Sequence, residues 1–345
     1  MRNFTGHASR SAFIAAAASA IALGVAAGSA AAQDKPKLGY SAPFLTDPFQ
    51  AIMANQTLKA VQEAGMETLP ATNANGDAAK QSTDVRNLIS AGAKALIINP
   101  TDSQAISPVL DFAAEKGVPA VLIDIAPAKG KAAMIVRADN KGIGAKACEA
   151  VGAALGGEGK VLSLMGDQAT TNGRDRTTGF NDCIKAKFPK IELIEQPTNW
   201  KADKATSAAQ TVVTTTPDLK AIYMQSDSVM LAGVLNVLKS AGKLTKVGEA
   251  NHIFLASVDG TPYAMEQIRQ GYLDVAVAQP LDLYAKYGAF YAKAALEGKT
   301  FQAGPTDHGS EIVHAGDNLM DYLPATVVTK ENASDPALWG NQAKE

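Results

Sequence analysis

Short apolar segments alternate along the chain with longer segments in which apolar residues recur at helical spacing. The apolar segments predict strands at 37–42, 66–71, 95–98, 120–123, 133–136, 161–165, 192–196, 221–224, 253–258, 275–278 and 325–329. Helical spacing predicts helices at 49–65, 78–91, 104–116, 142–155, 204–215, 229–240, 265–270 and 283–297, and another beginning near Arg174. This alternation predicts an α/β fold with doubly wound parallel sheets.

The two halves of the pattern resemble each other. KALIINPTDSQAI in the first half is similar to KAIYMQSDSVMLA in the second, and each is an apolar strand followed by a polar loop and a helix. A chain of 345 residues also suits two domains better than one. We therefore expect two similar lobes, although a chance likeness between α/β segments remains the alternative.

The N-terminal segment has the composition of a secretory signal peptide. Arg2 and Arg10 give it a basic start, residues 11–27 are apolar, and Ala30 and Ala32 form a small-residue cleavage pattern before Gln33. The alternative is a membrane anchor, but the apolar run is weakly hydrophobic and no basic stop follows it. We expect residues 1–32 to be removed and the rest of the chain to be exported without a membrane-inserted segment.

Charge and histidine spacing exclude several classes of function. The net charge is −2, which favours neither nucleic acid nor an anionic membrane as a partner. His252, His308 and His314 lack the paired spacing of metal ligands, and no phosphate-binding glycine loop follows a strand. We expect neither a metal nor a cofactor.

Two cysteines are present, Cys148 and Cys183. Each lies on a predicted helix, and these helices flank the strand at 161–165. Export would make a disulfide chemically possible. The sequence favours a structural disulfide, with two buried thiols as the alternative.

Polar and aromatic residues gather where the predicted strands end, the edge at which open α/β sheets bind ligands. The candidates are Asp47, Phe49, Asp124, Asp139, Asn140, Arg174, Trp200, Asp227, Asp259 and Gln279. Ionised carboxylates only accept hydrogen bonds and Arg only donates them, so together they orient hydroxyl groups. Phe49 and Trp200 can cover the apolar face of a sugar ring. The set predicts a site for a sugar or polyol between the lobes.

Arg174 is the central residue of this hypothesis. It lies at the junction between a polar loop and a helix, from which a guanidinium can reach across the strand ends. Alternatives remain for each candidate: the aspartates can be helix caps or turn formers, the aromatics can be core, and Arg174 can pair with Asp175 or Asp182 at the surface. An enzyme that cleaves or modifies sugars with Asp124 and Asp259 as paired carboxylates is the functional alternative.

Several motifs in one order resemble the periplasmic sugar-binding proteins of ABC importers, of the ribose-binding type. They are the loop at 46–49, the segments at 98–102 and 138–140, Arg174 followed by Gly179 and Phe180, Asp227, the segment at 258–262 and the segment at 278–280. The resemblance extends from about Lys37 to Lys330. It implies a receptor that closes about a hinge of three segments, near Asn140, near Gln279 and between Phe301 and Ala325, and hands its ligand to a permease.

The resemblance also implies a domain plan, and we expect the protein to be a monomer. The first lobe would comprise 33–139 and 280–312, the second 140–279 and 313–330, and residues 331–345 would form a loosely ordered tail. Departures from the family pattern put ribose itself in doubt. Gln50 replaces an aromatic, Ile125 replaces an arginine, and Ser226 replaces an asparagine; we include Gln50 and Ser226 in the candidate site. A monosaccharide, a polyol or a non-sugar signal remains open, and residues 304–318 resemble an insertion.

Overall fold

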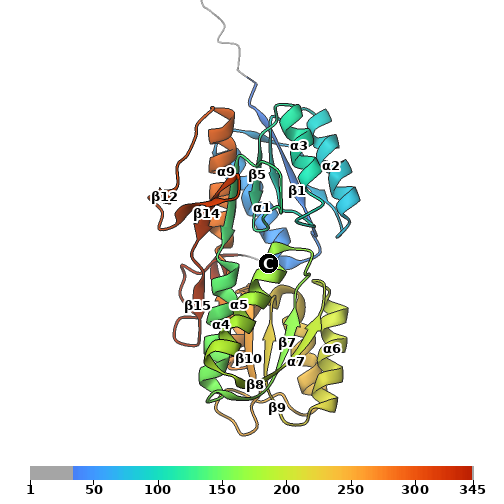
Figure 1. The fold of residues 1–345 in the computed structure, drawn as a ribbon, viewed down its shortest axis with the longest axis vertical. Coiled ribbons are helices and arrows are strands. Elements are labelled where there is room, and N and C mark those ends of the chain that lie inside the picture. Colours follow the sequence, from blue (N-terminus) through green and yellow to red (C-terminus); the bar gives the residue numbers. More distant parts are fainter. Residues whose placement is uncertain (1–33, 344–345) are drawn as a thin grey trace, which may run out of the picture. The chain divides into compact units, whose positions relative to one another are not determined.

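The structure is a computed structural model that describes residues 34–343. The expected signal peptide, residues 1–32, lies outside the described residues. The described chain forms two β-sheets, each with helices on both faces (Figure 1). The doubly wound α/β fold with two lobes, predicted from the sequence pattern, is therefore confirmed.

The sheet of the first lobe is parallel except at one edge, where strands β12 and β13 run antiparallel to their neighbours. Its strands lie in the order β12 (Gly304–Pro305), β13 (Glu311–Ala315), β14 (Asn318–Leu323), β6 (Met134–Ala138), β5 (Ala120–Ile123), β4 (Ala95–Ile98), β1 (Lys37–Ala42) and β2 (Glu67–Thr68), and β3 (Thr72–Asn73) also pairs with β1.

Four helices belong to this lobe: α1 (Pro48–Glu63), α2 (Ala78–Ser90), α3 (Ser107–Glu115) and α9 (Leu281–Leu296). Helices α1 and α9 pack together on one face, and α2 and α3 cover the other. Every residue of β4 is buried because Ala95 and Ile97 enter one core while Leu96 and Ile98 enter the other.

The sheet of the second lobe is parallel apart from its last strand. Its order is β15 (Thr326–Val328), β11 (Val275–Ala278), β10 (Phe254–Asp259), β9 (Leu219–Met224), β7 (Glu158–Met165) and β8 (Lys190–Pro197), with β15 antiparallel to β11. Its helices are α4 (Asn140–Ala154), α5 (Thr171–Lys187), α6 (Ala202–Thr215), α7 (Asp227–Ser240), α8 (Pro262–Gln270) and α10 (Trp339–Gln342). Helices α4 and α5 pack together, and α6 and α7 form a second pair.

The chain passes between the two sheets at three places. It leaves β6 for α4 between Ala138 and Asn140, returns from β11 to α9 between Ala278 and Leu281, and passes from β14 to β15 between Leu323 and Thr326. These crossings agree with the three-segment hinge that the resemblance implies. The crossings also bring the carboxyl ends of strands from both sheets toward the same region.

One boundary differs from the domain plan expected from the sequence. That plan places residues 313–323 in the second lobe, but β14 pairs with β6 in register Met320 to Ile135, so they belong to the first sheet. The stretch 304–318 adds the antiparallel strands β12 and β13 to that sheet. The polar, glycine-containing sequence of this stretch lacks the alternation of apolar and polar residues that is typical of a strand.

The C-terminal segment also differs from expectation. The sequence predicts a loose tail beyond residue 330, but Ala333 and Trp339 are buried in the structure. The short helix α10 contacts α8 of the second lobe. A single tryptophan in a polar segment is the signal that this stretch docks on the fold.

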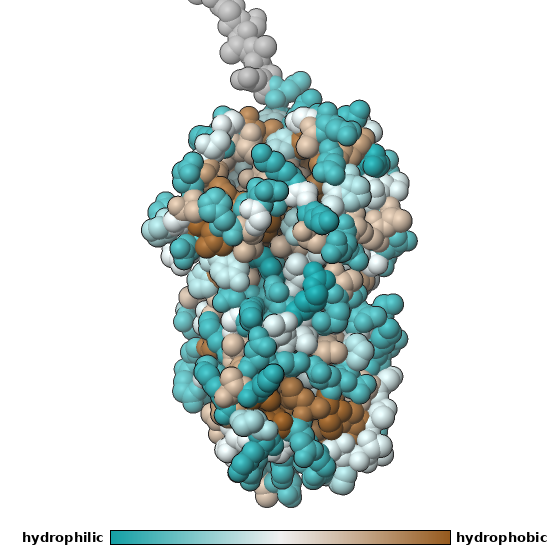
Figure 2. Space-filling view, viewed as in Figure 1, coloured by the Kyte–Doolittle hydropathy of each residue, from teal (hydrophilic) through white to brown (hydrophobic). Residues whose placement is uncertain are grey.

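Hydrophilic residues cover most of the face shown in Figure 2, with one continuous hydrophobic area over the second lobe. The exposed large apolar side chains include Val247, Tyr263 and Phe290. Within residues 34–343, none of the helices has the length and apolar character needed to cross a bilayer.

Candidate functional site

A cavity lies between the two lobes, with an empty volume of about 450 Å³. Both lobes line it, and most of the lining residues come from the loops that follow strands or from the first turns of helices. They are Pro43, Phe44, Asp47, Phe49, Gln50, Pro100, Thr101, Asp124, Ile125, Thr170, Asn172, Arg176, Trp200, Ser226, Asp259 and Gln279.

Eight of the predicted site residues line this cavity: Asp47, Phe49, Gln50, Asp124, Trp200, Ser226, Asp259 and Gln279. Three predicted residues, Asn140, Arg174 and Asp227, do not line it. The residues that the sequence argument missed include Phe44, Thr101, Asn172 and Arg176.

The arginine of the cavity is Arg176, not Arg174. Arg174 donates from Nη1 to the carbonyl of Gln168, 2.6 Å away, and is half-buried. Two residues on, the side chain of Arg176 is 2% exposed and faces the cleft. Two positions along an α-helix turn the side chain by about 200°, so these arginines occupy opposite faces. The helical spacing of Arg176, Phe180 and Cys183, all buried, is the signal that identifies the inward face.

The guanidinium of Arg176 is held at two atoms. Nε donates to Oδ1 of Asn140 at 2.7 Å, and Nη1 donates to the carbonyl of Gln225 at 2.5 Å. Nη1 also lies 3.6 Å from Oδ1 of Asp259. Among residues 34–343, Nη2 makes no hydrogen bond, which leaves it available to a ligand. Asn140, predicted as a ligand residue, thus positions Arg176 instead.

Asp259, at the end of β10, is surrounded by donors of the second lobe. Its Oδ2 accepts from Ser226 Oγ at 2.6 Å, and its Oδ1 accepts from Gln279 Nε2 at 2.7 Å. Burial raises the pKa of this carboxyl, and the Arg176 guanidinium opposes the rise. Its φ of 109° is strained for a residue other than glycine, a feature that clusters at binding sites.

Asp227, a further predicted ligand residue, lies behind Asp259. Its Oδ2 accepts from the backbone N–H of Gly260, and its Oδ1 accepts from Thr261 Oγ1 at 2.7 Å. Burial, with Asp259 adding, raises the pKa of Asp227 to about 7. The side chain therefore shapes the turn that carries Asp259 and does not face the cavity.

Asp124, at the end of β5, is surrounded by amides. Asn99 Nδ2 donates to its Oδ2 at 3.0 Å, and Gln50 Nε2 lies 3.4 Å from the same atom. Asn172 Nδ2, on α5 of the second lobe, donates to its Oδ1 at 2.6 Å. The hydrogen bonds of this carboxylate therefore span both lobes.

Asp47 caps α1 and faces the same cavity. Its Oδ1 accepts from the backbone N–H of Phe49 at 3.0 Å, and Pro48 follows as the first residue of the helix. Desolvation, with the carboxylate of Asp259 adding, raises the pKa of Asp47 to about 7. Asp47, Asp124 and Asp259 thus give the cavity three carboxyl groups against one guanidinium.

Aromatic rings form the apolar walls. Phe44 and Phe49 line the cavity from the first lobe, and Trp200 lines it from the second. The Trp200 ring lies under the guanidinium of Arg176, with Cζ 5.6 Å from the ring centroid. Gly166 permits this placement, because a Cβ there would come within 1.8 Å of the indole.

Further hydrogen bonds join the lobes beside the cavity. The backbone N–H of Thr171, on α5, donates to Ser103 Oγ of the first lobe at 2.9 Å. The backbone N–H of Ala126 donates to Thr171 Oγ1 at 3.1 Å. With the bond from Asn172 to Asp124, these contacts hold the lobes in a closed arrangement.

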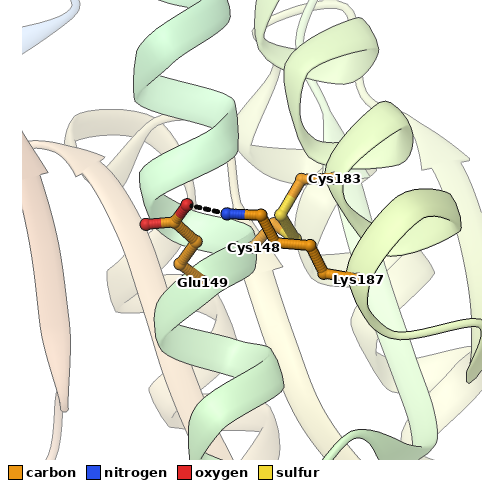
Figure 3. The surroundings of a disulfide bond; sticks show 4 residues. All are labelled: Cys148, Glu149, Cys183 and Lys187. Atoms are coloured by element: carbon orange, nitrogen blue, oxygen red, sulfur yellow. Dashed lines mark hydrogen bonds and ion pairs between the residues drawn. A yellow bond between two sulfur atoms is a disulfide. The ribbon is translucent and has the colours of Figure 1, made fainter.

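The site-bearing helices α4 and α5 are joined by a disulfide between Cys148 and Cys183, whose Cα atoms are 6.1 Å apart (Figure 3). The ion pair of Glu149 and Lys187 lies beside it. Near the site, a Cβ on Gly179 would come within 1.9 Å of the Lys141 carbonyl. Glycine there permits the close approach that brings Asn140 to Arg176.

Two α/β lobes, a three-segment crossing and a polar cavity between strand ends define a ligand-binding protein that encloses a small polar molecule. Residues 38–300 match the family model described as a periplasmic binding protein domain. The chain belongs to this family.

Relatives and solved structures that are similar to this chain are also binding proteins. The ribose import binding protein RbsB of Bacillus subtilis is 31% identical over 77% of this chain and 83% of that protein. RbsB of Escherichia coli is 30% identical over 83% and 93%. The crystal structure of an ABC transporter solute binding protein from Mycobacterium smegmatis, with bound glycerol, is 29% identical, has a TM-score of 0.75 and covers 87% of this chain and 96% of its own.

Proposed function

We propose that this protein is the substrate-binding component of an ABC importer and binds a monosaccharide or polyol in the cavity between its lobes. The observation that supports this most directly is the composition of the cavity: carboxylates and a guanidinium beside aromatic rings. Carboxylates and a guanidinium orient hydroxyl groups, and aromatic faces cover C–H groups. The two RbsB relatives are import binding proteins for ribose, the same ligand class.

The proposed ligand residues are those that both lobes present to the cavity. They are Asp47, Phe49, Gln50, Asp124, Arg176, Trp200, Ser226, Asp259 and Gln279. Asn140 and Asp227 act behind them, on Arg176 and on the turn at Asp259. Arg174 does not belong to the set.

The proposed mechanism is closure about the three crossings. A bound ligand adds contacts to both lobes that exist only in the closed arrangement, so it shifts the population toward that arrangement. Hinge closure around a ligand is the motion by which periplasmic binding proteins enclose their cargo. The permease then recognises the closed form.

The proposed location is the periplasm, reached through the predicted signal peptide at 1–32. The alternative of a sugar-cleaving enzyme is not carried forward, because the family and its relatives are binding proteins. In this proposal Asp124 and Asp259 hold hydroxyl groups.

A thermal-shift screen of the chain from Gln33 onward tests the proposal. D-ribose, other pentoses, hexoses, deoxy sugars, xylitol and glycerol form the test set, with amino acids as controls. A ligand present at a hundredfold over its dissociation constant adds about 2.7 kcal/mol to the stability of the folded state. A clear rise in melting temperature with one carbohydrate is expected. No change in melting temperature with any carbohydrate, together with a rise with an amino acid, would overturn the proposed ligand class.

A further inference from the structure

The C-terminal segment 332–343 reaches the wall of the ligand cavity from behind. Trp339 is 3% exposed, and its Nε1 donates to the carbonyl of Asp259 at 3.1 Å. Its ring meets Phe49 edge-on, with the centroids 5.6 Å apart. Both partners of the indole, Asp259 and Phe49, line the cavity, but they belong to different lobes.

The segment is anchored on the second lobe. Arg269, at the end of α8, donates from Nη1 to the carbonyl of Ala333 at 3.0 Å and to Oδ1 of Asn341 at 2.9 Å. Asn341 Nδ2 also donates a hydrogen bond to the Ala333 carbonyl, at 3.0 Å. Gly340 lies so close to the chain that a Cβ would come within 2.2 Å of the Gly260 carbonyl. The segment therefore moves with the second lobe.

The contact to the first lobe runs through the indole. Ala333 and the neighbouring Leu338 pack into the core under α7 and α8, whereas Trp339 belongs to the apolar cluster that contains Phe49. When the lobes separate, a segment anchored at Arg269 carries its indole away from Phe49. The edge-on contact is thus a contact of the closed arrangement.

We propose that Trp339 is a positioning residue of the ligand site, and that the segment 332–343 straps the two lobes together when they close. The indole N–H holds the backbone at Asp259, whose strained φ of 109° requires outside support. The ring holds Phe49 against the cavity. The part of this inference that concerns ligand affinity rests on the proposed function.

The test measures lobe closure directly. Both native cysteines are bonded to each other, so cysteines introduced at exposed Asn87 on α2 and exposed Thr211 on α6 accept spin labels selectively. Double electron–electron resonance then gives the closed fraction, without ligand and across a titration of D-ribose. Stopped-flow gives the dissociation rate of D-ribose.

Three variants separate the roles. Trp339→Ala should lower the closed fraction, because it removes the edge-on contact with Phe49. It should speed dissociation by about tenfold, because it also removes the hydrogen bond that supports Asp259. Trp339→Phe retains the ring and should recover part of the effect. Arg269→Ala leaves the cavity untouched and should shift the closed fraction in the same direction, because it releases the anchor.

Phe301→Ala is the matched control, since Phe301 is an aromatic residue of the first lobe that packs on Tyr291 away from the cavity. It should lower the melting temperature without changing the closed fraction. An unchanged closed fraction in folded Trp339→Ala and Arg269→Ala, at every D-ribose concentration, would overturn the strap. If D-ribose does not bind the unmodified protein, the ligand-free closed fractions decide the strap, and the thermal-shift screen of the other carbohydrates decides the ligand proposal.

Discussion

The two halves of the cavity hold their carboxylates in different ways. Asp259 takes its hydrogen bonds from Ser226 and Gln279 and lies near the Arg176 guanidinium. Those partners come with the second sheet and its helices. Asp124 is held by neutral amides, and one of them, Asn172, comes from the opposite lobe. The second half is therefore assembled before the lobes meet, whereas the first half is completed by closure.

This difference suggests an order of events. A ligand meets a preorganised half-site on the second lobe, where α4 and α5 are joined by a disulfide and packed through glycine. Preorganisation lowers the cost of binding. The first lobe then closes, and Asn172 reaches Asp124. Each prediction below tests one side of this comparison.

The largest effect is expected from Arg176→Ala. It removes the only guanidinium lining the cavity in the described chain, leaves the buried Asp259 carboxylate without its cationic partner and leaves the Gln225 carbonyl without its donor. Truncating one partner of a buried charge pair costs about 2–5 kcal/mol of binding energy. Arg174→Ala is the matched control and should change affinity little. Isothermal titration that found the larger loss in Arg174→Ala would place Arg174, not Arg176, on the ligand.

Loss of the disulfide should cost stability more than affinity. A bridge that closes a loop with a sequence separation of 35 contributes about 3–4 kcal/mol by the loop-entropy estimate. Urea unfolding with and without reductant measures it, and Cys148→Ser with Cys183→Ser repeats it without reductant. Equal unfolding midpoints in the oxidised and reduced protein would contradict a structural role for the bridge.

Gly179→Ala should loosen the contact between α4 and α5. The added methyl would meet the Lys141 carbonyl, and overpacking of this kind costs about 1–3 kcal/mol. Because this contact brings Asn140 to Arg176, affinity should fall together with stability. Thr178→Ala, at the exposed neighbouring position, is the control. If both variants unfold at the same urea concentration as the unmodified protein, the close packing is not needed.

The last prediction concerns the pH dependence of stability and Asp47 in the first half of the cavity. Its pKa is about 7 in the folded protein against an ordinary value of 3.8, so the folded state binds the proton more tightly than the unfolded chain. Stability of the ligand-free protein should therefore fall as the pH rises from about 4 to about 7. Asp47→Asn keeps a good helix cap and removes the contribution of Asp47, while Asp227 and Asp259 keep theirs. The difference in melting temperature between Asp47→Asn and the unmodified protein should therefore shift in favour of the variant as the pH rises.

The control for this titration is Asp77→Asn, which also changes a capping aspartate, at the start of α2 and outside the cavity. It should not reproduce the gain. A pH profile of Asp47→Asn parallel to that of the unmodified protein would show that this carboxyl does not couple to its neighbours in the cavity.

Strand and helix periods predicted the fold because most strands are buried on both faces and end at turn residues. Two segments are exceptions. The polar stretch 304–318 forms β12 and β13 without showing the strand period, and residues 332–343 dock through one tryptophan. Strand ends also identified six of the cavity residues, and comparison with the family pattern added Gln50 and Ser226. The sequence argument chose Arg174 for the cavity in place of Arg176 because both residues lie at the same loop–helix junction. Only the direction in which each side chain points from the helix distinguishes them. Asn172 and Phe44 depend on how the lobes meet, which sequence spacing does not show.

The most direct test of the account is a crystal structure of the protein with the carbohydrate that gives the strongest thermal shift. We predict a closed arrangement with ligand hydroxyl groups within hydrogen-bond distance of Asp124, Asp259 and Arg176 Nη2, and a ring or carbon chain against Phe49 and Trp200. A ligand bound outside this cavity, or held by Arg174 in place of Arg176, would contradict the account.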